Sequence, residues 1–338
     1  MSELGIGLIG CGRWGKRLAN MVEAEVSGAR MVAVQNRTFS RAEEFAQELG
    51  VKAHRTAQDV IGDPAVDAIL IVSPHNEHEP VTVAAAAAGK HIFCDKPLAI
   101  NVQQCRSMVD AAEKHGVKLV CGHNTRLFPT HWQAAEIVKS GRLGKLAAIS
   151  GANLSHINRV NWWAKLETMG TFLHSPAVHV IDYMLFVGGK ACSVQAVESK
   201  VKIQPDVEFQ DTAFLLIEFE SGAIGSIQAS VSCPVPGAGH GYHILGSEAS
   251  LQFDQGATAI TIVGMDKKKE VIEVEPNGYE KQCDIGNRRE LETFVNWITK
   301  GEEPLLTGQD GLRAVEIIDA AYLSMRERKA IDLPLPVA

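Results

Sequence analysis

The first third of the chain alternates short apolar runs with amphipathic segments. The apolar runs predict buried strands over residues 4–9, 31–34, 68–72, 91–94 and 119–121. Helical spacing of apolar positions between them predicts helices over residues 14–26, 41–49, 78–88 and 102–115. Gly50, Gly89 and Gly116 stand where carboxyl-terminal caps are expected. Repeated strand and helix units of this kind predict a doubly wound parallel sheet, covered by helices on both faces.

The pattern changes after about residue 125. Short apolar runs joined by turns predict strands over residues 194–201, 212–219, 223–231, 242–245, 251–253, 259–263 and 271–274. Helices are expected over residues 178–186, 290–298 and 312–325. We therefore expect two domains, residues 1–124 and residues 125–338, the second an α+β domain with an antiparallel sheet. A half-apolar sheet face left in water is an interaction surface, so we expect a homodimer or homotetramer formed through this sheet.

Composition narrows the class of protein. Hydrophobic residues make up 46% of the 338 residues and charged residues 22%, as in ordinary globular proteins. Acids outnumber bases by 40 to 33, which argues against a broad nucleic-acid-binding surface. Apolar runs fall short of the roughly 20 residues of a membrane span, and the amino terminus lacks a basic leader, so we expect a cytoplasmic protein without membrane partners. The seven cysteines show no C-x-x-C spacing, and no metal site is expected.

A glycine motif follows the first predicted strand and opens the first predicted helix. The motif is Gly10-Cys11-Gly12-Arg13-Trp14-Gly15. In a G-x-G-x-x-G turn the first glycine allows a tight bend, the second admits a pyrophosphate, and the third lets helix pack on strand. The helix amino terminus offers its free N–H groups to the anion. This context predicts a Rossmann dinucleotide-binding domain, a ligand-free glycine turn being the alternative.

The end of the second predicted strand bears on which dinucleotide is bound. An NAD-binding unit usually places an acid here for the ribose 2′-hydroxyl. This chain has Asn36-Arg37-Thr38, with Arg41 close behind. With no carboxylate to repel it, a 2′-phosphate can be held by two guanidinium groups and a hydroxyl. We expect NADP to be preferred, with NAD possible, although arginines that merely solvate a helix start would look the same.

Two further motifs carry a resemblance to a known family. They are Cys94-Asp95-Lys96-Pro97 after the fifth apolar run and Ser175-Pro176-Ala177-Val178-His179-Val180-Ile181-Asp182 in the second domain. Together with the glycine motif, their order and spacing resemble the Gfo/Idh/MocA oxidoreductases over nearly the whole chain. The resemblance implies a Rossmann domain with an open-faced antiparallel sheet domain. It also implies oxidation of a secondary hydroxyl of a sugar or cyclitol, or the reverse reduction.

The resemblance assigns roles to a lysine and a histidine. Lys96 lies beside the nicotinamide and stabilises a developing alkoxide, while His179 takes the hydroxyl proton as general base. Asp182, three positions on, would orient the imidazole or help to cap the helix packing. A lysine on a solvated loop and a histidine buried in a core are the structural alternatives.

Two positions depart from the family pattern. Asp95 replaces a glutamate and keeps the carboxylate, whereas Ser175 replaces an aspartate that many members have four residues before the histidine. A serine can only hydrogen bond, so His179 should be a weaker base that depends more on Lys96.

Other polar and aromatic residues are expected to shape the pocket. The expected cofactor or substrate contacts are Ser73, Pro74, His75 and His78 after the third of the predicted parallel strands, Asn124 after the last, and Trp162 and Trp163 in the second domain. Loop and cap chemistry explains the first group equally well, and the tryptophans would serve either to pack on a sugar ring or as a buried anchor.

These observations predict an NADP-preferring dehydrogenase or reductase. Its substrate would be a small molecule: a sugar, a cyclitol or a related alcohol such as an aromatic dihydrodiol. The competing hypothesis from another class is a non-catalytic nucleotide-binding sensor on the same scaffold. Retention of both Lys96 and His179 favours catalysis, while Ser175 favours the sensor.

Overall fold

The chain divides into two units, each with its own sheet. Unit 1 comprises Met1–His123 and Asn287–Leu312, and unit 2 comprises Asn124–Gly286 and Arg313–Ala338. The computed structural model describes residues 3–156, 161–200, 207–233, 241–254, 258–276 and 278–336. The segment Asn287–Leu312, which the sequence pattern places in the second domain, thus belongs to unit 1.

Unit 1 contains a six-stranded parallel sheet. Its strands are β1 (Leu4–Ile9), β2 (Ala29–Gln35), β3 (Lys52–His54), β4 (Ala68–Ile71), β5 (His91–Asp95) and β6 (Leu119–Gly122). Their order is β3-β2-β1-β4-β5-β6, and every described pairing is parallel. The sequence pattern predicts five of these strands and misses β3. The predicted doubly wound parallel sheet is confirmed.

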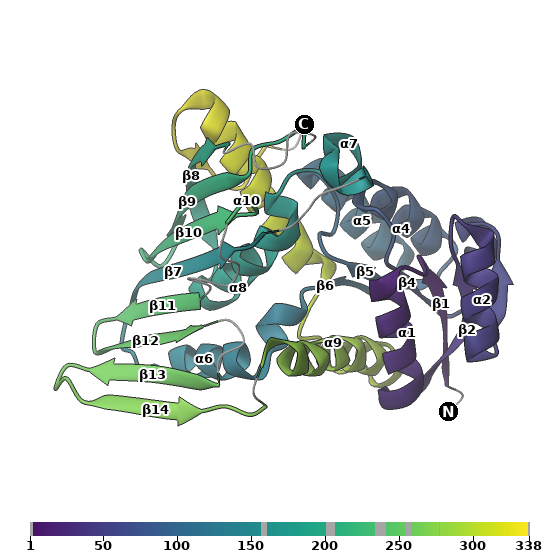
Figure 1. Cartoon of the computed structure of the whole chain (residues 1–338), viewed down its shortest axis with the longest axis horizontal. Helices are drawn as coiled ribbons and strands as arrows, with labels where there is room; N and C mark the ends of the chain where they lie inside the picture. The colour runs from purple at the N-terminus through teal and green to yellow at the C-terminus, as the bar shows by residue number, and fades with distance from the viewer. Residues whose placement is uncertain are drawn as a thin grey trace. The chain divides into compact units, whose positions relative to one another are not determined.

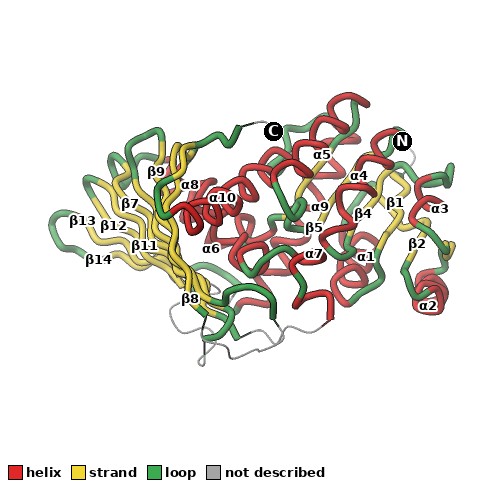
Figure 2. The backbone as a smooth tube through the Cα atoms, turned by 90° about the horizontal axis from the view of Figure 1, so that it is seen from above, coloured by secondary structure: helices red, strands yellow, loops and turns green. Residues whose placement is uncertain are grey.

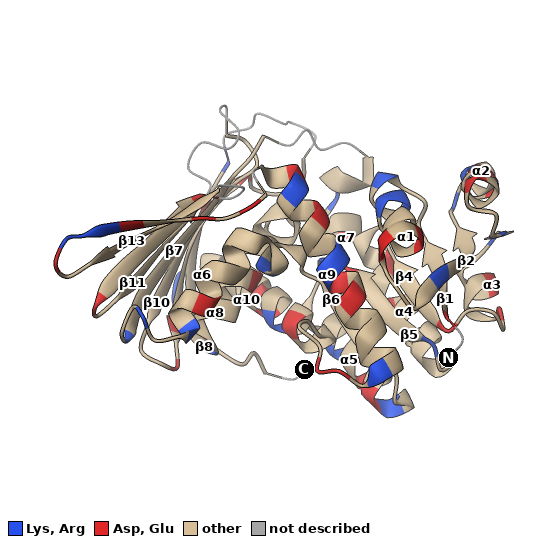
Figure 3. Cartoon of the chain, turned by 90° about the horizontal axis from the view of Figure 1, so that it is seen from below, with Lys and Arg blue, Asp and Glu red and all other residues tan. Residues whose placement is uncertain are grey.

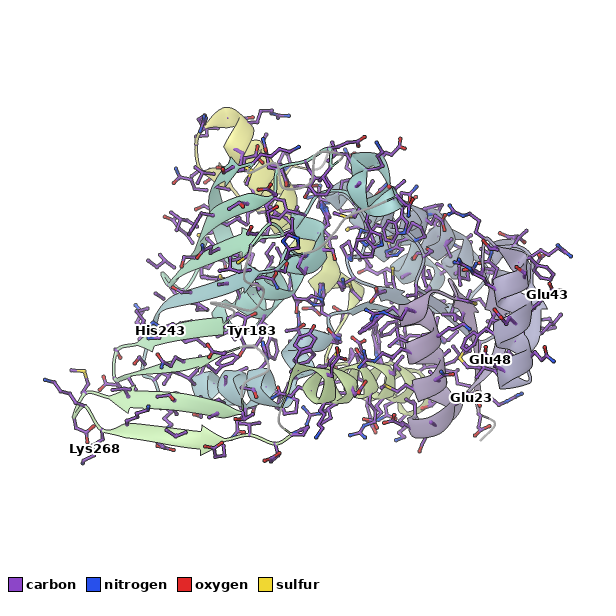
Figure 4. The ribbon with its side chains drawn as sticks, in the orientation of Figure 1. Glu23, Glu43, Glu48, Tyr183, His243 and Lys268 are labelled. Atoms are coloured by element: carbon purple, nitrogen blue, oxygen red, sulfur yellow. The ribbon has the colours of Figure 1, made fainter. Side chains whose placement is uncertain are left out.

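Helices cover both faces of this sheet. They are α1 (Arg13–Glu25), α2 (Phe39–Leu49), α3 (Ala57–Ile61), α4 (His78–Ala87) and α5 (Val102–His115). Figures 1 and 2 show α1 and α2 on one face and α3, α4 and α5 on the other. Gly50 and Gly116 end α2 and α5 in the left-handed conformation, as their cap positions predict. Lys16 of α1 pairs with Glu48 of α2, which is labelled in Figure 4.

Unit 2 is built on a nine-stranded sheet. Its strands are β7 (Leu146–Leu154), β8 (Ala191–Ser199), β9 (Thr212–Phe219), β10 (Ile224–Ser230), β11 (Gly241–Gly246), β12 (Ala249–Asp254), β13 (Ala259–Gly264), β14 (Lys269–Glu273) and β15 (Ile331–Asp332). The order is β14-β13-β12-β11-β7-β10-β9-β8-β15. The predicted antiparallel sheet is confirmed for the other described pairings, whereas β7 pairs with β10 in parallel. β7 has no counterpart in the sequence prediction, since its small residues give it little apolar alternation.

One face of this sheet packs against helices and the other is open. The longer helices are α6 (Pro129–Lys139), α8 (Val178–Gly188), α9 (Tyr279–Lys300) and α10 (Gly308–Glu327), and α7 (Leu166–Met169) is short. Figure 2 shows α6, α8 and α10 on one side of the sheet, and the Ala196 N–H of β8 donates to Ser324 Oγ of α10. The helices α9 and α10 each contain residues of both units.

The open face of the sheet is partly apolar. Side chains exposed on it include Val197, Phe214, Leu216, Ile224, Leu245, Val263 and Val271. No described helix covers this face. The ribbon in Figure 3 is coloured for charged residues near the β13 to β14 turn, and Lys268 of this turn pairs with Asp266. Among the described residues, no helix is long and apolar enough to cross a membrane.

The covered face of the sheet contains a buried histidine in an aromatic cluster. His131 of α6 packs edge-on against the rings of Phe128, Tyr183, Tyr242 and Phe253. Neither of its ring nitrogens has a hydrogen-bond partner in the described part of the chain. Burial lowers the pKa of His131 to about 3, so the imidazole is neutral in the folded protein near neutral pH.

This histidine should make stability depend on pH. In the unfolded chain the imidazole takes up a proton below its ordinary pKa of about 6.5, whereas the folded protein resists protonation down to about 3. The free energy of unfolding therefore falls as pH falls through this window. In wild type this effect should lower the free energy of unfolding by about 2 kcal/mol between pH 7 and pH 5, and His131→Met should abolish that decrease. Urea unfolding of wild type and variant at both pH values measures the difference, and an unchanged pH dependence would contradict this account.

Candidate functional site

The three motif glycines occupy three different environments. Gly10 has φ +106°, and a Cβ on it would lie 2.3 Å from the Val72 carbonyl oxygen. A Cβ on Gly15 would lie 2.0 Å from the Gly10 carbonyl oxygen, so α1 packs on the turn only because this residue has no side chain. A Cβ on Gly12 would meet nothing within 4 Å. The turn is thus closed on the two sides where protein packs and open at Gly12, as a pyrophosphate-binding turn requires.

The start of α1 is suited to an anion. Gly12 is the N-cap, and a glycine has no side chain that could bind the first N–H groups of the helix. The first turn contains no acidic residue. The first N–H groups of a helix lack carbonyl partners within it, and they carry the positive end of the helix dipole. Arg13 is exposed beside them, while Trp14 is half-buried. A phosphate at this turn would therefore meet donors and positive charge.

The end of β2 leads into a cationic segment. Asn36 Nδ2 donates to the Thr38 carbonyl at 3.1 Å, and Thr38 is the N-cap of α2 without a side-chain cap hydrogen bond. Arg37 and Arg41 are exposed, and neither forms an ion pair with a described residue. Two guanidinium groups and a hydroxyl are therefore available to an incoming anion.

A third arginine, which the sequence prediction did not include, lies at the same helix start. The Arg55 guanidinium stacks on the Phe39 ring, 3.9 Å from its centroid, and Phe39 is the first residue of α2. Arg55 directly follows β3, which is only three residues long. A strand so short gives no periodicity signal, and recognition of β3 would have drawn attention to Arg55.

The loop after β4 is tied to the loop after β5 by a buried histidine. His78, the first residue of α4, is 1% exposed. Its Nε2 lies 3.0 Å from the Ser73 carbonyl oxygen and its Nδ1 lies 2.9 Å from the Pro97 carbonyl oxygen. Burial lowers the pKa of His78. The imidazole thus lies between main-chain carbonyls of the two loops, and in its neutral form it can donate to one of them.

Lys96 occupies the position expected for it at the end of a parallel strand. It directly follows Asp95, the last residue of β5, and its peptide bond to Pro97 is cis. Burial raises the pKa of Asp95 to about 6, although the charge of Lys96 and the Trp14 side chain act to lower it. Lys96 is half-buried. A partly desolvated ammonium of this kind interacts more strongly with a developing negative charge than one in open water does.

The predicted cofactor residues of unit 1 lie along one edge of its sheet. The strand order places the ends of β2, β1, β4 and β5 side by side, and these ends carry Asn36, Gly10, Ser73 and Lys96. Ser73 Oγ and Asn76 Oδ1 are buried without a hydrogen-bond partner among the described residues. His75 is buried with its ring 5.6 Å from that of His78, and Pro74 is half-buried. The open turn and the unpartnered oxygens fit a bound dinucleotide.

The second motif lies at the start of α8 in unit 2. Ser175 is buried and extended, with φ −163°, and its bond to Pro176 is cis. His179, one residue into α8, is half-buried. His174 Nδ1 accepts a hydrogen bond from the Thr171 N–H at 2.9 Å, so this neighbouring imidazole is held within its own segment.

Asp182 forms a buried ion pair that the sequence prediction did not anticipate. Both of its carboxylate oxygens accept hydrogen bonds from Arg126, one from Nε at 2.9 Å and the other from Nη2. The Arg126 guanidinium also lies 4.9 Å from the Phe186 ring centroid. This ion pair links α8 to the segment that follows β6, while the role of Asp182 in orienting the imidazole stays a prediction.

Three further residues that were predicted to contact cofactor or substrate have partners within unit 2. Asn124 is buried, and its Nδ2 lies 3.6 Å from Cys283 Sγ as a weak donor. Trp162 and Trp163 stack on each other with ring centroids 4.3 Å apart, and both are half-buried against the core. This arrangement favours the anchor alternative for the tryptophans. No group of three described His, Cys, Asp or Glu side chains could hold a metal ion.

Comparison with known proteins agrees with this architecture. A Rossmann unit with a dinucleotide turn, in one chain with a mixed-sheet unit, is typical of nicotinamide-dependent oxidoreductases. Residues 4–123 match the model of the oxidoreductase family's NAD-binding Rossmann fold, and residues 135–333 match that of its C-terminal alpha/beta domain. The chain belongs to the Gfo/Idh/MocA family of oxidoreductases, as the motifs predict.

Its relatives span almost the whole chain. It is 27% identical to a myo-inositol 2-dehydrogenase of Thermotoga maritima, covering 97% of this chain and 98% of that protein. It is 26% identical to a trans-1,2-dihydrobenzene-1,2-diol dehydrogenase of Mus musculus, covering 91% and 90%. A levoglucosan dehydrogenase solved with NADH and levoglucosan is 24% identical and superposes with a TM-score of 0.88, covering 99% of this chain and 100% of that chain.

Two glycine variants should separate folding from nucleotide binding. Gly15→Ala forces a Cβ against the Gly10 carbonyl and should lower the free energy of unfolding by about 1–3 kcal/mol or more. Gly12→Ala has free space and should cost at most about 1 kcal/mol of stability. Its methyl group narrows the open side of the turn, so dinucleotide affinity should fall by about tenfold or more. Urea unfolding and fluorescence titration with NADPH measure both effects, and normal affinity in Gly12→Ala would argue against binding at this turn.

Proposed function

We propose that this protein is an NADP(H)-preferring oxidoreductase that transfers a hydride between nicotinamide and a secondary hydroxyl or carbonyl. The proposed substrates are sugars, cyclitols and related alcohols such as aromatic dihydrodiols. The observation that carries the proposal is the glycine turn, closed at Gly10 and Gly15 and open at Gly12, on the same sheet edge as Lys96. The relatives are named as dehydrogenases of an inositol, a dihydrodiol and levoglucosan, which supports a sugar, cyclitol or related alcohol as the substrate.

In the proposed mechanism this chain supplies an ammonium and an imidazole. When bound, the nicotinamide supplies the hydride chemistry. The Lys96 ammonium stabilises negative charge on the substrate oxygen as the carbon–hydrogen bond breaks. His179 accepts the hydroxyl proton during oxidation and returns it during reduction. Ser175 contributes a hydrogen bond in place of a second negative charge, so proton transfer depends more on Lys96.

The catalytic roles predict a separation between turnover and cofactor binding. Lys96→Met or His179→Asn should lower kcat by at least about a hundredfold, because each removes a proton or charge partner of the transition state. The Kd for NADPH should change by only a few-fold. Reduced-nicotinamide absorbance over a panel of sugars, inositols and dihydrodiols measures turnover. Near-normal turnover in both variants would overturn the roles, and tight NADPH binding with no turnover of any substrate would favour the sensor hypothesis.

The preference for NADP is supported by the absence of an acid at the end of β2. Arg37, Thr38 and Arg41 stand there instead, and the first turn of α2 contains no acidic residue. The double variant Arg37→Met/Arg41→Met should weaken NADPH binding by about tenfold or more and leave NADH binding within about twofold. Isothermal titration of both cofactors measures this, and a wild-type preference for NADH would refute the proposal.

We also propose that two or four copies assemble through the open sheet face. Small side chains on its central strands, such as Ala148 and Ser150, are flanked by exposed apolar ones, including Phe214 and Leu216 on one side and Val263 on the other. A two-fold axis can bring such a face onto itself. His243, labelled in Figure 4, points to this face, because the preceding Tyr242 packs on Tyr183 on the covered face.

All seven cysteines are free, which suits the proposed location in a reducing, cytoplasmic compartment.

Assembly through this face predicts the effect of added charge. Phe214→Glu together with Leu216→Lys should convert the oligomer to monomer, because charged groups would be buried within the interface. Light scattering after gel filtration measures the mass of each form. Glu270→Lys, at the exposed sheet edge, is a control expected to leave the oligomer intact. A monomeric wild type, or an oligomer unaffected by the double variant, would exclude this face.

A further inference from the structure

We propose that Arg55 is a third guanidinium that binds the 2′-phosphate of NADP(H) and contributes to the discrimination between the two cofactors. This inference depends on the cofactor preference proposed above and extends it to a residue outside the motif after β2. Three structural features support it: the register of β3, the stacking of the side chain, and the absence of a carboxylate partner.

The register of β3 brings Arg55 to the nucleotide edge of the sheet. β3 runs parallel to β2, and His54 is the partner of Gln35, the last residue of β2. Asn36 directly follows β2 and Arg55 directly follows β3, so the two residues lie at the same edge of the sheet. Gln35 Nε2 also donates to the Arg55 carbonyl at 3.3 Å, which holds the main chain of the two strand ends together.

The side chain of Arg55 is held at the start of α2. Its guanidinium lies 3.9 Å from the centroid of Phe39, the residue that follows the N-cap Thr38. An arginine stacked on a ring keeps its N–H groups free at the edge of the plane, where they can bind a phosphate in bidentate fashion. Stacking also removes part of the rotational freedom that an exposed arginine would lose on binding.

The arginines at this edge have no acidic partners. In the described part of the chain, no carboxylate forms an ion pair with Arg37, Arg41 or Arg55. Asp59, four positions after Arg55, is bound instead by the Thr56 main-chain N–H at 3.0 Å in a capping box. Three unneutralised cations at one helix start repel one another, and a dianionic phosphate monoester would relieve this repulsion.

The test is equilibrium binding of NADPH and NADH to the full-length protein. Arg55→Met keeps an unbranched stem against Phe39 and removes the charge, so the Kd for NADPH should rise by about tenfold or more while that for NADH stays within about twofold. Arg55→Lys should recover part of the loss. Arg30→Met is the control, because Arg30 is also exposed and lies near the opposite end of β2, where it faces Glu3 at 3.9 Å. It should bind both cofactors as wild type does.

The outcomes separate this inference from the proposed cofactor preference. One outcome overturns only the role of Arg55. In this outcome wild type prefers NADPH, the double variant at Arg37 and Arg41 loses that preference, and Arg55→Met keeps it. If Arg55→Met weakens both cofactors equally, Arg55 does not read the 2′-phosphate and the inference is wrong. A wild type that binds NADH as tightly as NADPH would overturn both. Thermal unfolding of each variant shows that the differences come from binding and not from loss of fold.

Discussion

The packing of main chain against main chain at the glycine turn is the constraint on which unit 1 depends. Gly15 brings α1 against the Gly10 carbonyl, and Gly10 in turn lies against the carbonyl of Val72, which directly follows the neighbouring strand β4. Contacts this close are possible only without Cβ atoms. They determine where the amino terminus of α1 lies relative to the sheet, and therefore where an anion can meet its N–H groups. The ends of β2, β4 and β5 take their places around this turn because the sheet order requires it.

The polar groups of both units are held by buried contacts rather than by solvent-exposed ones. His78 is buried between a carbonyl of the loop after β4 and a carbonyl of the loop after β5, which begins with Lys96. Arg126 fixes Asp182, and with it the helix that contains His179. A buried charge or imidazole left without its partners would be costly, so these contacts allow few alternative arrangements. Functional side chains are thereby presented from rigid supports, which is what orientation-dependent chemistry needs.

Much of the fold could be predicted from the chain because its strands and helices have strong periodicity. β1, β9 and α5 have the predicted bounds, and most other predicted elements differ by a few residues, whereas α9 begins at Tyr279 and its predicted helix at residue 290. The missed elements share a weak signal. α6 turns Thr130 and His131 toward the core, and the first half of α9 buries Gln282, so apolar spacing does not mark either helix. β3 has only three residues, and its omission concealed Arg55. The pairing of Asp182 with Arg126 could not be predicted, because the two residues are 56 positions apart in the sequence.

The sequence by itself determined the class of protein, the glycine turn and the motifs of Lys96 and His179, since each depends on local residue type and spacing. Only the tertiary structure decided which groups meet within each unit. The parallel pairing of β7 with β10, the Arg126 to Asp182 pair, the place of His78 between two main-chain carbonyls and the stacking of Arg55 on Phe39 are all contacts between separate elements. Such contacts follow from how elements pack, and local periodicity contains no information about the partner. The burial that raises the pKa of Asp95 and lowers that of His131 arises in the same way.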